Sequence, residues 1–214
     1  MFRIGAKKGW GRGAVKLRAG VFGGRLKARV GPYLLPPAVR RFYLAAEREA
    51  KRLGDERTLE ERSTALSLRQ LLRWARGRQT VAEIGTSAGW AAIALALADQ
   101  DRQVITLDPF PHPQRHRYLA LVPEQVRDRV QLVSARGEDG PPASLRPDFL
   151  FIDEAHEHQG VVACFQAWRP ALQPGALVVF HDYHSTWPGV ISAVQELGLD
   201  GEVRQTSFLW RAPV

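Results

Sequence analysis

The sequence predicts one α/β domain built on a mostly parallel sheet with helices on both faces. Two observations carry this prediction. Short apolar runs alternate with stretches of helical periodicity, which is the order of strand–helix–strand units. The run over 81–84 also leads through a loop bracketed by Gly85 and Gly89 into an Ala/Leu-rich helix. At 214 residues the chain is long enough for one sizeable core plus an extension.

Charge is distributed unevenly along the chain. Residues 1–53 carry 14 Lys and Arg against Glu47 and Glu49, a net charge of +12, whereas residues 54–214 carry 16 against 20, a net charge of −4. We therefore divide the chain into a basic Gly/Pro-rich arm (1–37), helices that cover the site (38–77) and the main domain (78–214). The arm is expected to contact an anionic surface, either a membrane or a nucleic acid.

Cysteine content and hydropathy bear on the compartment. The one cysteine, Cys164, has no partner for an internal disulfide and falls on a helical apolar stripe, so we expect it in the core. No stretch has the length of a bilayer-spanning helix, and the N-terminus lacks an apolar signal core. These features favour a cytoplasmic protein, with peripheral membrane association as the alternative, and they are compatible with a homo-oligomer.

Two amphipathic helices are predicted before the glycine loop. Apolar residues at 39, 42, 43, 46, 50 and 53 define the first, which stops at Gly54. Thr58 and Glu61 have the spacing of a capping box for the second, which runs to Ala75 and stops at Gly77. We expect both helices to pack on one face of the sheet.

The remaining elements follow in alternation. Strands are predicted over 103–107, 130–133 and 148–152, and a fifth strand ends at His181 and Asp182. A helix then begins at Thr186 and Pro188 and stops at Gly198. Closing edge strands, one of them antiparallel, are predicted within 203–211.

The spacing of the glycines in this loop distinguishes between two kinds of ligand-binding loop. A dinucleotide fingerprint requires G-x-G-x-x-G, but Ser87 stands at the middle glycine's place. The pattern E-x-G-T-x-x-G from Glu83 to Gly89 instead resembles the first motif of class I S-adenosylmethionine-dependent methyltransferases, especially small O-methyltransferases. The resemblance implies that Gly85, Thr86, Ser87 and Gly89 hold the methionine end of S-adenosylmethionine and that Glu83 helps to anchor it.

Two further contacts with that cofactor are predicted. An acid at the end of the second strand can accept hydrogen bonds from ribose hydroxyls, and Asp108 stands there. The resemblance also assigns Ala135 and Arg136 to the turn that contacts adenine. Three residues in the Pro-rich segment after Asp108 are expected to form a solvated rim, with a wall of the substrate site as the alternative: His112, Arg115 and His116.

A second and more specific match covers 147–183, PDFLFIDEAHEHQGVVACFQAWRPALQPGALVVFHDY. It resembles the FIDGDHxYxG and LxPGGxxxxHD motifs of small O-methyltransferases, relatives of the catechol type. Glu154, Ala155, His158 and Ala176 depart from those motifs. The resemblance implies a Rossmann-like methyltransferase fold.

Three candidate ligands of a divalent cation stand at the ends of strands four and five: Asp153, His181 and Asp182. Ends of neighbouring parallel strands meet at one edge of a sheet. The resemblance implies Mg²⁺, and an imidazole ligand is also compatible with Mn²⁺, Fe²⁺ or Zn²⁺. The alternative is that these side chains only hydrogen-bond neighbouring loops. We also expect Asp153 to contact the cofactor. Asp153 and His156 are the predicted catalytic residues, with His156 as the candidate base.

The sequence therefore predicts an enzyme that methylates a hydroxyl of a small-molecule acceptor from S-adenosylmethionine, with a divalent cation as a candidate helper. Two alternatives stay open. One is RNA methylation with the basic arm clamping phosphates. The other is a cofactor-binding or membrane-associated protein without catalysis, suggested by the departures at Glu154 and Ala155.

Overall fold

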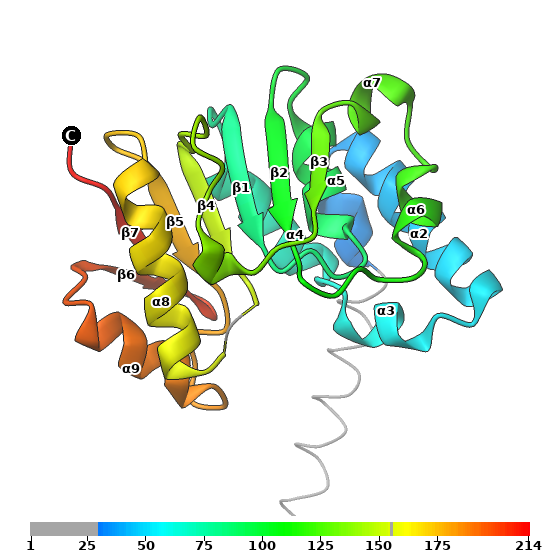
Figure 1. The fold of residues 1–214 in the computed structure, drawn as a ribbon. Coiled ribbons are helices and arrows are strands. Elements are labelled where there is room, and N and C mark those ends of the chain that lie inside the picture. The colour runs from blue at the N-terminus through cyan, green and yellow to red at the C-terminus, as the bar shows by residue number, and fades with distance from the viewer. Residues whose placement is uncertain (1–29, 155) are drawn as a thin grey trace, which may run out of the picture.

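The computed structural model describes residues 30–154 and 156–214. They form a seven-stranded sheet in the order β3-β2-β1-β4-β5-β7-β6, with helices on both faces (Figure 1). The strand order reverses between β1 and β4, as it does in open doubly wound sheets. The predicted fold class, a mostly parallel sheet with an antiparallel strand near the C-terminus, is confirmed.

The strands are short, and the two over 149–152 and 177–180 are apolar throughout. Their bounds are β1 Thr80–Ile84, β2 Gln103–Leu107, β3 Val130–Val133, β4 Phe149–Ile152, β5 Leu177–Phe180, β6 Gly201–Arg204 and β7 Ser207–Arg211. In register, Ile84 pairs with both Leu107 and Ile152, and Ile152 pairs with Phe180. The residues that follow these four strands therefore emerge side by side at the carboxyl edge of the sheet.

Helices cover each face of the sheet (Figure 1). On the first face lie α2 Pro37–Leu53, α3 Glu56–Glu61, α4 Ala65–Trp74, α5 Trp90–Ala98, α6 Arg115–Leu119 and α7 Glu124–Arg127. On the second face lie α8 His158–Trp168 and α9 Pro188–Glu196. Three short 3-10 turns join them: η1 Gly31–Leu34, η2 Gly137–Asp139 and η3 Arg169–Ala171.

Each layer of helices has its own apolar core against the sheet. On the α5 side, the rings of Phe42, Tyr43 and Tyr118 pack edge-on around Trp90, with centroid distances of 6.2, 5.4 and 5.5 Å. Such edge-to-face pairs add to the stabilisation that burial itself provides. On the α8 side, Cys164 is buried in the core, as predicted.

The helices before the glycine loop differ from the prediction at one boundary. The capping box at Thr58 is wrong, because Asp55 caps α3 by accepting a hydrogen bond from the Thr58 N–H. The chain then breaks at Arg62, whose backbone is extended, and Thr64 caps α4 by accepting from the Ser67 N–H. Two side-chain caps nine residues apart, the Asp55 carboxylate and the Thr64 hydroxyl, thus divide the expected second helix into α3 and α4.

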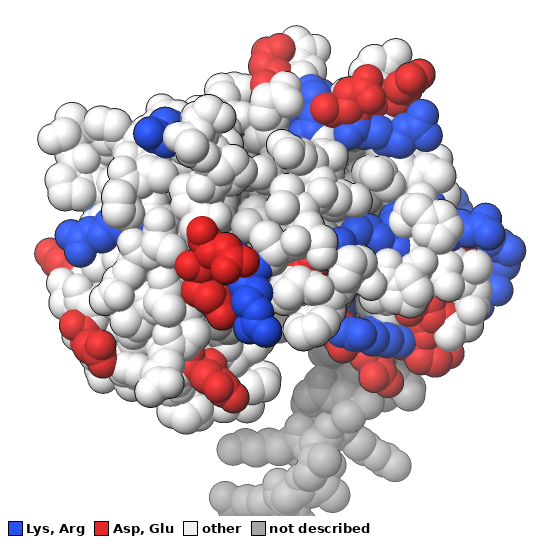
Figure 2. Space-filling view, viewed as in Figure 1, with Lys and Arg blue, Asp and Glu red and all other residues white. Residues whose placement is uncertain are grey.

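The basic arm predicted over 1–37 is described only from residue 30, where η1 packs against α4. Residues 1–29, which hold most of the arm's charge, lie outside the described residues. On the face drawn in Figure 2, acidic and basic side chains are interspersed. Within the ranges 30–154 and 156–214, no helix is long and apolar enough to cross a bilayer.

Candidate functional site

The site is built where β1, β2, β4 and β5 end at the carboxyl edge. Gly85, Asp108, Asp153 and His181 are the residues that directly follow these strands. The structure therefore brings together four positions that lie far apart in the sequence. Contacts between the loops that follow these strands fix their arrangement.

Gly85 lies against the backbone of the loop after β4. Its φ is +100°, and a Cβ built on it would lie 2.5 Å from the carbonyl oxygen of Asp153. Glycine alone accommodates both the left-handed backbone and the close approach. The Asp153 N–H donates to the Ile84 carbonyl at 2.8 Å. This contact places Asp153 beside the glycine loop.

Ser87, at the middle glycine's place, takes up the left-handed backbone with a φ of +44°. Its N–H donates to Asp108 Oδ2 at 2.8 Å, and the Phe110 N–H donates to Asp108 Oδ1 at 2.8 Å. Backbone donors on both sides thus fix the Asp108 carboxylate at the mouth of the glycine loop.

Arg115 is a site residue that the sequence interpretation missed. It was expected in a solvated rim, but it is only 7% exposed. Its Nε donates to the Ser87 carbonyl at 2.9 Å and its Nη2 to Asp108 Oδ2 at 3.2 Å. The available signal was the three-residue spacing to Tyr118, which puts both side chains on the buried face of α6.

The expectation of a solvated rim is also wrong for His112, which is 7% exposed, whereas His116 is exposed as expected. His112 Nε2 lies 3.2 Å from the Thr58 hydroxyl, and the Tyr118 hydroxyl donates to Asp55 Oδ2 at 2.5 Å. Burial lowers the pKa of His112. This polar contact joins the N-terminal helices to the segment that carries Arg115.

Glu83 is buried, with 1% of its surface exposed. The Thr106 hydroxyl donates to its Oε2 at 2.6 Å, and the Thr86 hydroxyl lies 2.6 Å from that of Thr106. Burial raises the pKa of Glu83 to about 8, although the Thr106 hydrogen bond opposes the rise. At neutral pH the carboxyl is therefore mostly protonated, and it can donate a hydrogen bond as well as accept one.

A cavity opens beside Glu83. Its walls are the glycine loop, Asp153, and the Arg62–Ser63 link between α3 and α4. The N-terminal helices therefore supply one wall of the site.

Asp153, His181 and Asp182 converge next to this cavity. One ligand-type atom from each lies within 4.8 Å of the others. His181 Nδ1 is 2.7 Å from Asp153 Oδ1 and 3.4 Å from Asp182 Oδ1. Among the described residues this buried nitrogen has no partner in hydrogen-bond geometry. Two carboxylates and an orphaned imidazole nitrogen fit the donor set of a divalent cation.

The backbone and charges of this cluster are unusual. Asp182 has a left-handed φ of +54°, a conformation that non-glycine residues adopt at a cost and that often marks functional sites. Burial lowers the pKa of His181, but Asp153 and Asp182 outweigh it and raise that pKa to about 10. Burial raises the pKa of Asp182, whereas the hydrogen bond with His156 and the nearby imidazole of His181 hold it well below its usual range. The cluster thus favours positive charge between its carboxylates.

His156 lies at the border of the cluster. Its Nε2 is 2.9 Å from Asp182 Oδ2, and its ring packs on Trp187 with the centroids 4.2 Å apart. A Cβ on Gly189 would collide with the His156 carbonyl oxygen and the His158 N–H. The start of α9 therefore presses on the 156–158 backbone and fixes the position of His156.

The turn after β3 has a different character. Ala135 packs against the α8-side core, whereas Arg136 is exposed and its N–H donates to Asp139 Oδ2 at 2.9 Å. Glu154, noted in the sequence only as a departure, faces this turn. Burial, and then the nearby Asp108 and Glu138, raise the pKa of Glu154.

Comparison with known proteins agrees with this arrangement. Residues 82–183 match the family model described as "Methyltransferase domain". No curated protein matches the chain in sequence.

Solved structures share the fold at low sequence identity. The cofactor-bound structure of Rv0187 from MTB superposes with a TM-score of 0.59 at 21% identity, over 72% of this chain and 83% of its own. The O-methyltransferase TomG from Streptomyces achromogenes, solved with SAM, gives 0.56 at 19% identity over 72% and 82%. A putative caffeoyl-CoA O-methyltransferase from Staphylococcus aureus gives 0.57 at 16% identity over 79% and 98%. At these identities the likeness establishes the fold.

Proposed function

We propose that this chain, a class I methyltransferase by its fold and by the domain match over 82–183, transfers the methyl group of S-adenosylmethionine to a hydroxyl oxygen of a small acceptor. One observation carries the proposal. The glycine loop and Asp153 line one cavity, and Asp108 accepts a hydrogen bond from the Ser87 N–H of that loop. Asp153 also belongs to the cluster with His181 and Asp182.

The edge residues fit the chemistry of the cofactor. The glycine loop and Glu83 would hold the methionine end, and Ala135 and Arg136 would lie on the adenine side. Asp108 would bind the ribose. Its Oδ2 already accepts from Ser87 and Arg115, but Oδ1 accepts only from Phe110 and keeps a lone pair for a hydroxyl.

S-adenosylmethionine, when bound, supplies an electrophilic methyl group on a sulfonium sulfur. The acceptor oxygen forms a bond to that carbon as the sulfur–carbon bond breaks, so the chain must align the acceptor and remove its proton. In our proposal His156 accepts this proton at Nδ1. Its Nε2 faces Asp182 Oδ2, which favours the tautomer with hydrogen on Nε2 and leaves Nδ1 free as an acceptor.

The cluster Asp153, His181 and Asp182 would hold a divalent cation, which would fix and acidify the acceptor hydroxyl. Oxygen donors suit Mg²⁺, and the imidazole extends the set to Mn²⁺, Fe²⁺ and Zn²⁺. His181 supports this assignment because its buried Nδ1 lies between two carboxylates outside hydrogen-bond geometry.

Calorimetric titration with S-adenosylmethionine tests the cofactor assignment. The wild-type chain is expected to bind one equivalent, and Asp108→Asn is expected to lose at least about tenfold in affinity because a charged acceptor is removed. Asp128→Asn, an exposed acid remote from the edge, is the matched control. A wild-type chain that does not bind, or equal affinity in the Asp108→Asn variant, would overturn the proposal.

Transfer of a labelled methyl group to a panel of phenolic, sugar and aliphatic alcohols tests the reaction. His156→Gln is expected to lower kcat by about a hundredfold or more, the size of a general-base contribution, while cofactor affinity stays unchanged. If kcat does not fall in this variant, His156 is not the base.

A further inference from the structure

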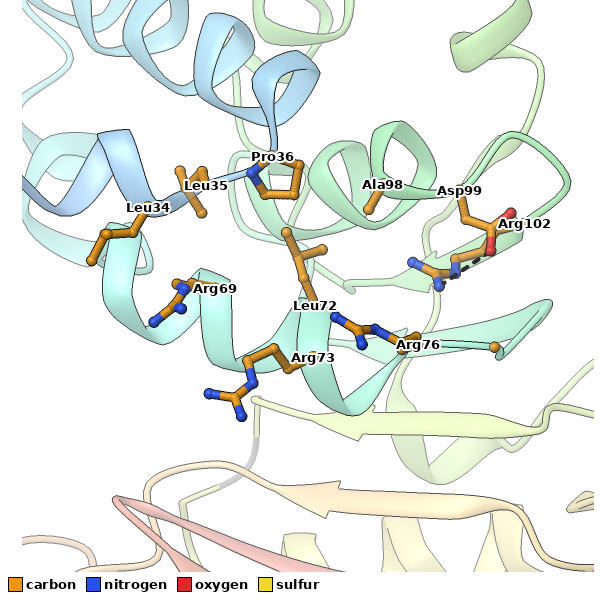
Figure 3. Close-up of a pocket in the computed structure, with 11 residues that line it drawn as sticks. Leu34, Leu35, Pro36, Arg69, Leu72, Arg73, Arg76, Ala98, Asp99 and Arg102 are labelled. Atoms are coloured by element: carbon orange, nitrogen blue, oxygen red, sulfur yellow. Dashed lines mark ion pairs between the residues drawn. The ribbon is translucent and has the colours of Figure 1, made fainter.

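A second cavity, of about 460 Å³, lies away from the carboxyl edge (Figure 3). It is open to solvent and is lined by α4, the end of α5 and the segment that leads into α2. Gly77 and Arg102, which line it, come shortly before β1 and β2, so the cavity lies toward the amino ends of those strands. Ligands of open α/β sheets bind at the opposite edge, and the residues proposed for methyl transfer do not line this cavity.

The cavity combines an apolar wall with a basic one. Figure 3 shows Arg69 and Arg73 on α4 and Arg76 in the turn that follows it, with Leu34, Leu35 and Pro36 on one side and Ala98, Asp99 and Arg102 on the other. Its volume falls within the range of small-molecule sites, which is about 300–1,000 Å³.

Three arginines of this cavity have no anionic partner within the ranges 30–154 and 156–214. No salt bridge or side-chain hydrogen bond joins Arg69, Arg73 or Arg76 to a described carboxylate. The acid of the cavity, Asp99, is already paired with Arg102 at 3.7 Å and accepts from Gln79 at 3.3 Å.

The spacing of these arginines is costly for the helix itself. Arg69 and Arg73 are four residues apart on one face of α4, and like charges at this spacing destabilise a helix. The negative end of the helix dipole accounts for basic residues in and after the last turn, but Arg69 stands in the middle of α4. A bound anion would remove this repulsion.

Apolar side chains are exposed beside the basic wall. Val30 is 50% exposed, Tyr33 65% and Leu34 50%, and Leu34 also lines the cavity. Single exposed apolar residues are ordinary, but three within five positions, of which Leu34 lines the basic cavity, suit a ligand with an apolar portion.

We propose that this cavity binds the phosphate group of a ligand that also carries an apolar portion, with the guanidinium groups of Arg69, Arg73 and Arg76 on the phosphate oxygens. The planar donor fork of arginine matches phosphate. The same chemistry is offered by the headgroup of an anionic phospholipid and by a small phosphate ester. The site is independent of the proposed methyl transfer.

Nucleic acid is the less suitable occupant. Proteins that bind single-stranded nucleic acid stack its bases on aromatic side chains. Tyr33, next to Leu34 in the sequence, already has the Arg40 guanidinium 5.6 Å from its ring centroid. The apolar wall also has no counterpart in a phosphodiester backbone.

The test is a calorimetric titration of the full chain with three probes: a short-chain phosphatidylglycerol below its micelle concentration, inorganic phosphate, and a single-stranded RNA oligonucleotide. The pocket variant combines Arg69→Gln, Arg73→Gln and Arg76→Gln. The control variant combines Arg48→Gln, Lys51→Gln and Arg117→Gln, which removes the same charge from exposed positions elsewhere. Both variants keep the basic arm, and circular dichroism confirms that both are folded.

Wild-type and control chains are expected to bind the short-chain lipid saturably, and the pocket variant at least tenfold more weakly. Tighter binding of the lipid than of inorganic phosphate assigns the apolar wall to the acyl or glycerol portion, and equal binding assigns the site to phosphate alone. Equal lipid affinity in the pocket and control variants would overturn the proposal and locate binding elsewhere, such as on the arm. So would RNA binding that is lost in the pocket variant without any response to lipid or phosphate.

Discussion

Arg115 binds both partners of the contact that closes the glycine loop. Its guanidinium donates to the Ser87 carbonyl and to the Asp108 carboxylate, while the Ser87 N–H donates to the same carboxylate. The Arg115 side chain, from α6, thus holds the loop after β1 against Asp108, the residue that follows β2. The shape of the proposed cofactor site depends on an arginine outside its own motif.

Replacing Arg115 by Met should therefore weaken both folding and cofactor binding. Methionine keeps the apolar stem but leaves the Asp108 carboxylate, 14% exposed, without its guanidinium. We expect a loss of about 1–3 kcal/mol in the free energy of unfolding in urea, as for other buried polar groups that lose a partner. We also expect a higher Kd for S-adenosylmethionine. Arg117→Met, exposed and two residues away, is the control. Tighter cofactor binding would instead show that Arg115 competes with the ribose.

Gly85→Ala should destabilise the chain more than an ordinary glycine replacement. The added Cβ lowers the free energy of unfolding in two ways. The left-handed backbone costs about 1–2 kcal/mol, and overpacking against the Asp153 carbonyl costs about 1–3 kcal/mol. Gly198→Ala, at a φ of +61° with open space around it, carries only the first cost. Urea unfolding of both variants measures the difference. Equal losses would mean that the β4 loop yields to the methyl group.

Glu83→Gln should remove part of the pH dependence of folding. The pKa of Glu83 is about 8 in the folded chain and near its usual 4.5 when unfolded. The folded state therefore binds its proton more tightly, so its contribution to stability is full below pH 4.5 and is lost as the pH rises towards 8. Relative to the uncharged variant, the wild-type chain should lose up to about 1.4 kcal/mol per pH unit in this window. Urea unfolding from pH 5 to pH 8.5 measures the difference in free energy of unfolding between the two chains. A difference that stays constant over this range would contradict the prediction.

A divalent cation should stabilise the chain through Asp182. At about a hundred times its Kd, a cation that binds only the folded state adds about 2.7 kcal/mol to the free energy of unfolding. After treatment with a chelator, Mg²⁺, Mn²⁺ and Zn²⁺ are added in turn while Tm is followed. At least one is expected to raise the Tm of the wild-type chain and to leave Asp182→Asn unchanged. Asp200→Asn, an exposed acid after α9, provides the comparison. Equal shifts in all three chains would assign the ion to another place.

Much of the fold was accessible from the sequence because the strand signals are local. Apolar runs with acids or glycines directly after them located β1, β2 and β4, and the two matched motifs gave their order. The break between α3 and α4 at Arg62 could not be predicted from the sequence. Thr58 has the spacing of a cap, but Asp55, three residues earlier, competes for the same role, and sequence spacing does not rank the two.

The candidate site was accessible from the sequence in the glycine loop and at the ends of strands. Asp108, Asp153 and His181 were found in this way. Arg115 and His112 were missed because their burial depends on how α6 packs against α3 and α5, and a Pro-rich segment with three basic or titratable residues has the composition of a solvated loop. Their contacts cross between elements that spacing alone does not relate.

The backbone between β4 and α8 is contacted at two places, by Gly85 at Asp153 and Glu154 and by Gly189 at 156–158. A Cβ at either glycine would collide with that backbone. Evolution or engineering that alters the range of acceptors is therefore expected to keep both glycines and to act on the side chains around them, in the link between α3 and α4 and in the turn before α9. A survey of natural variation should find insertions concentrated in those two segments.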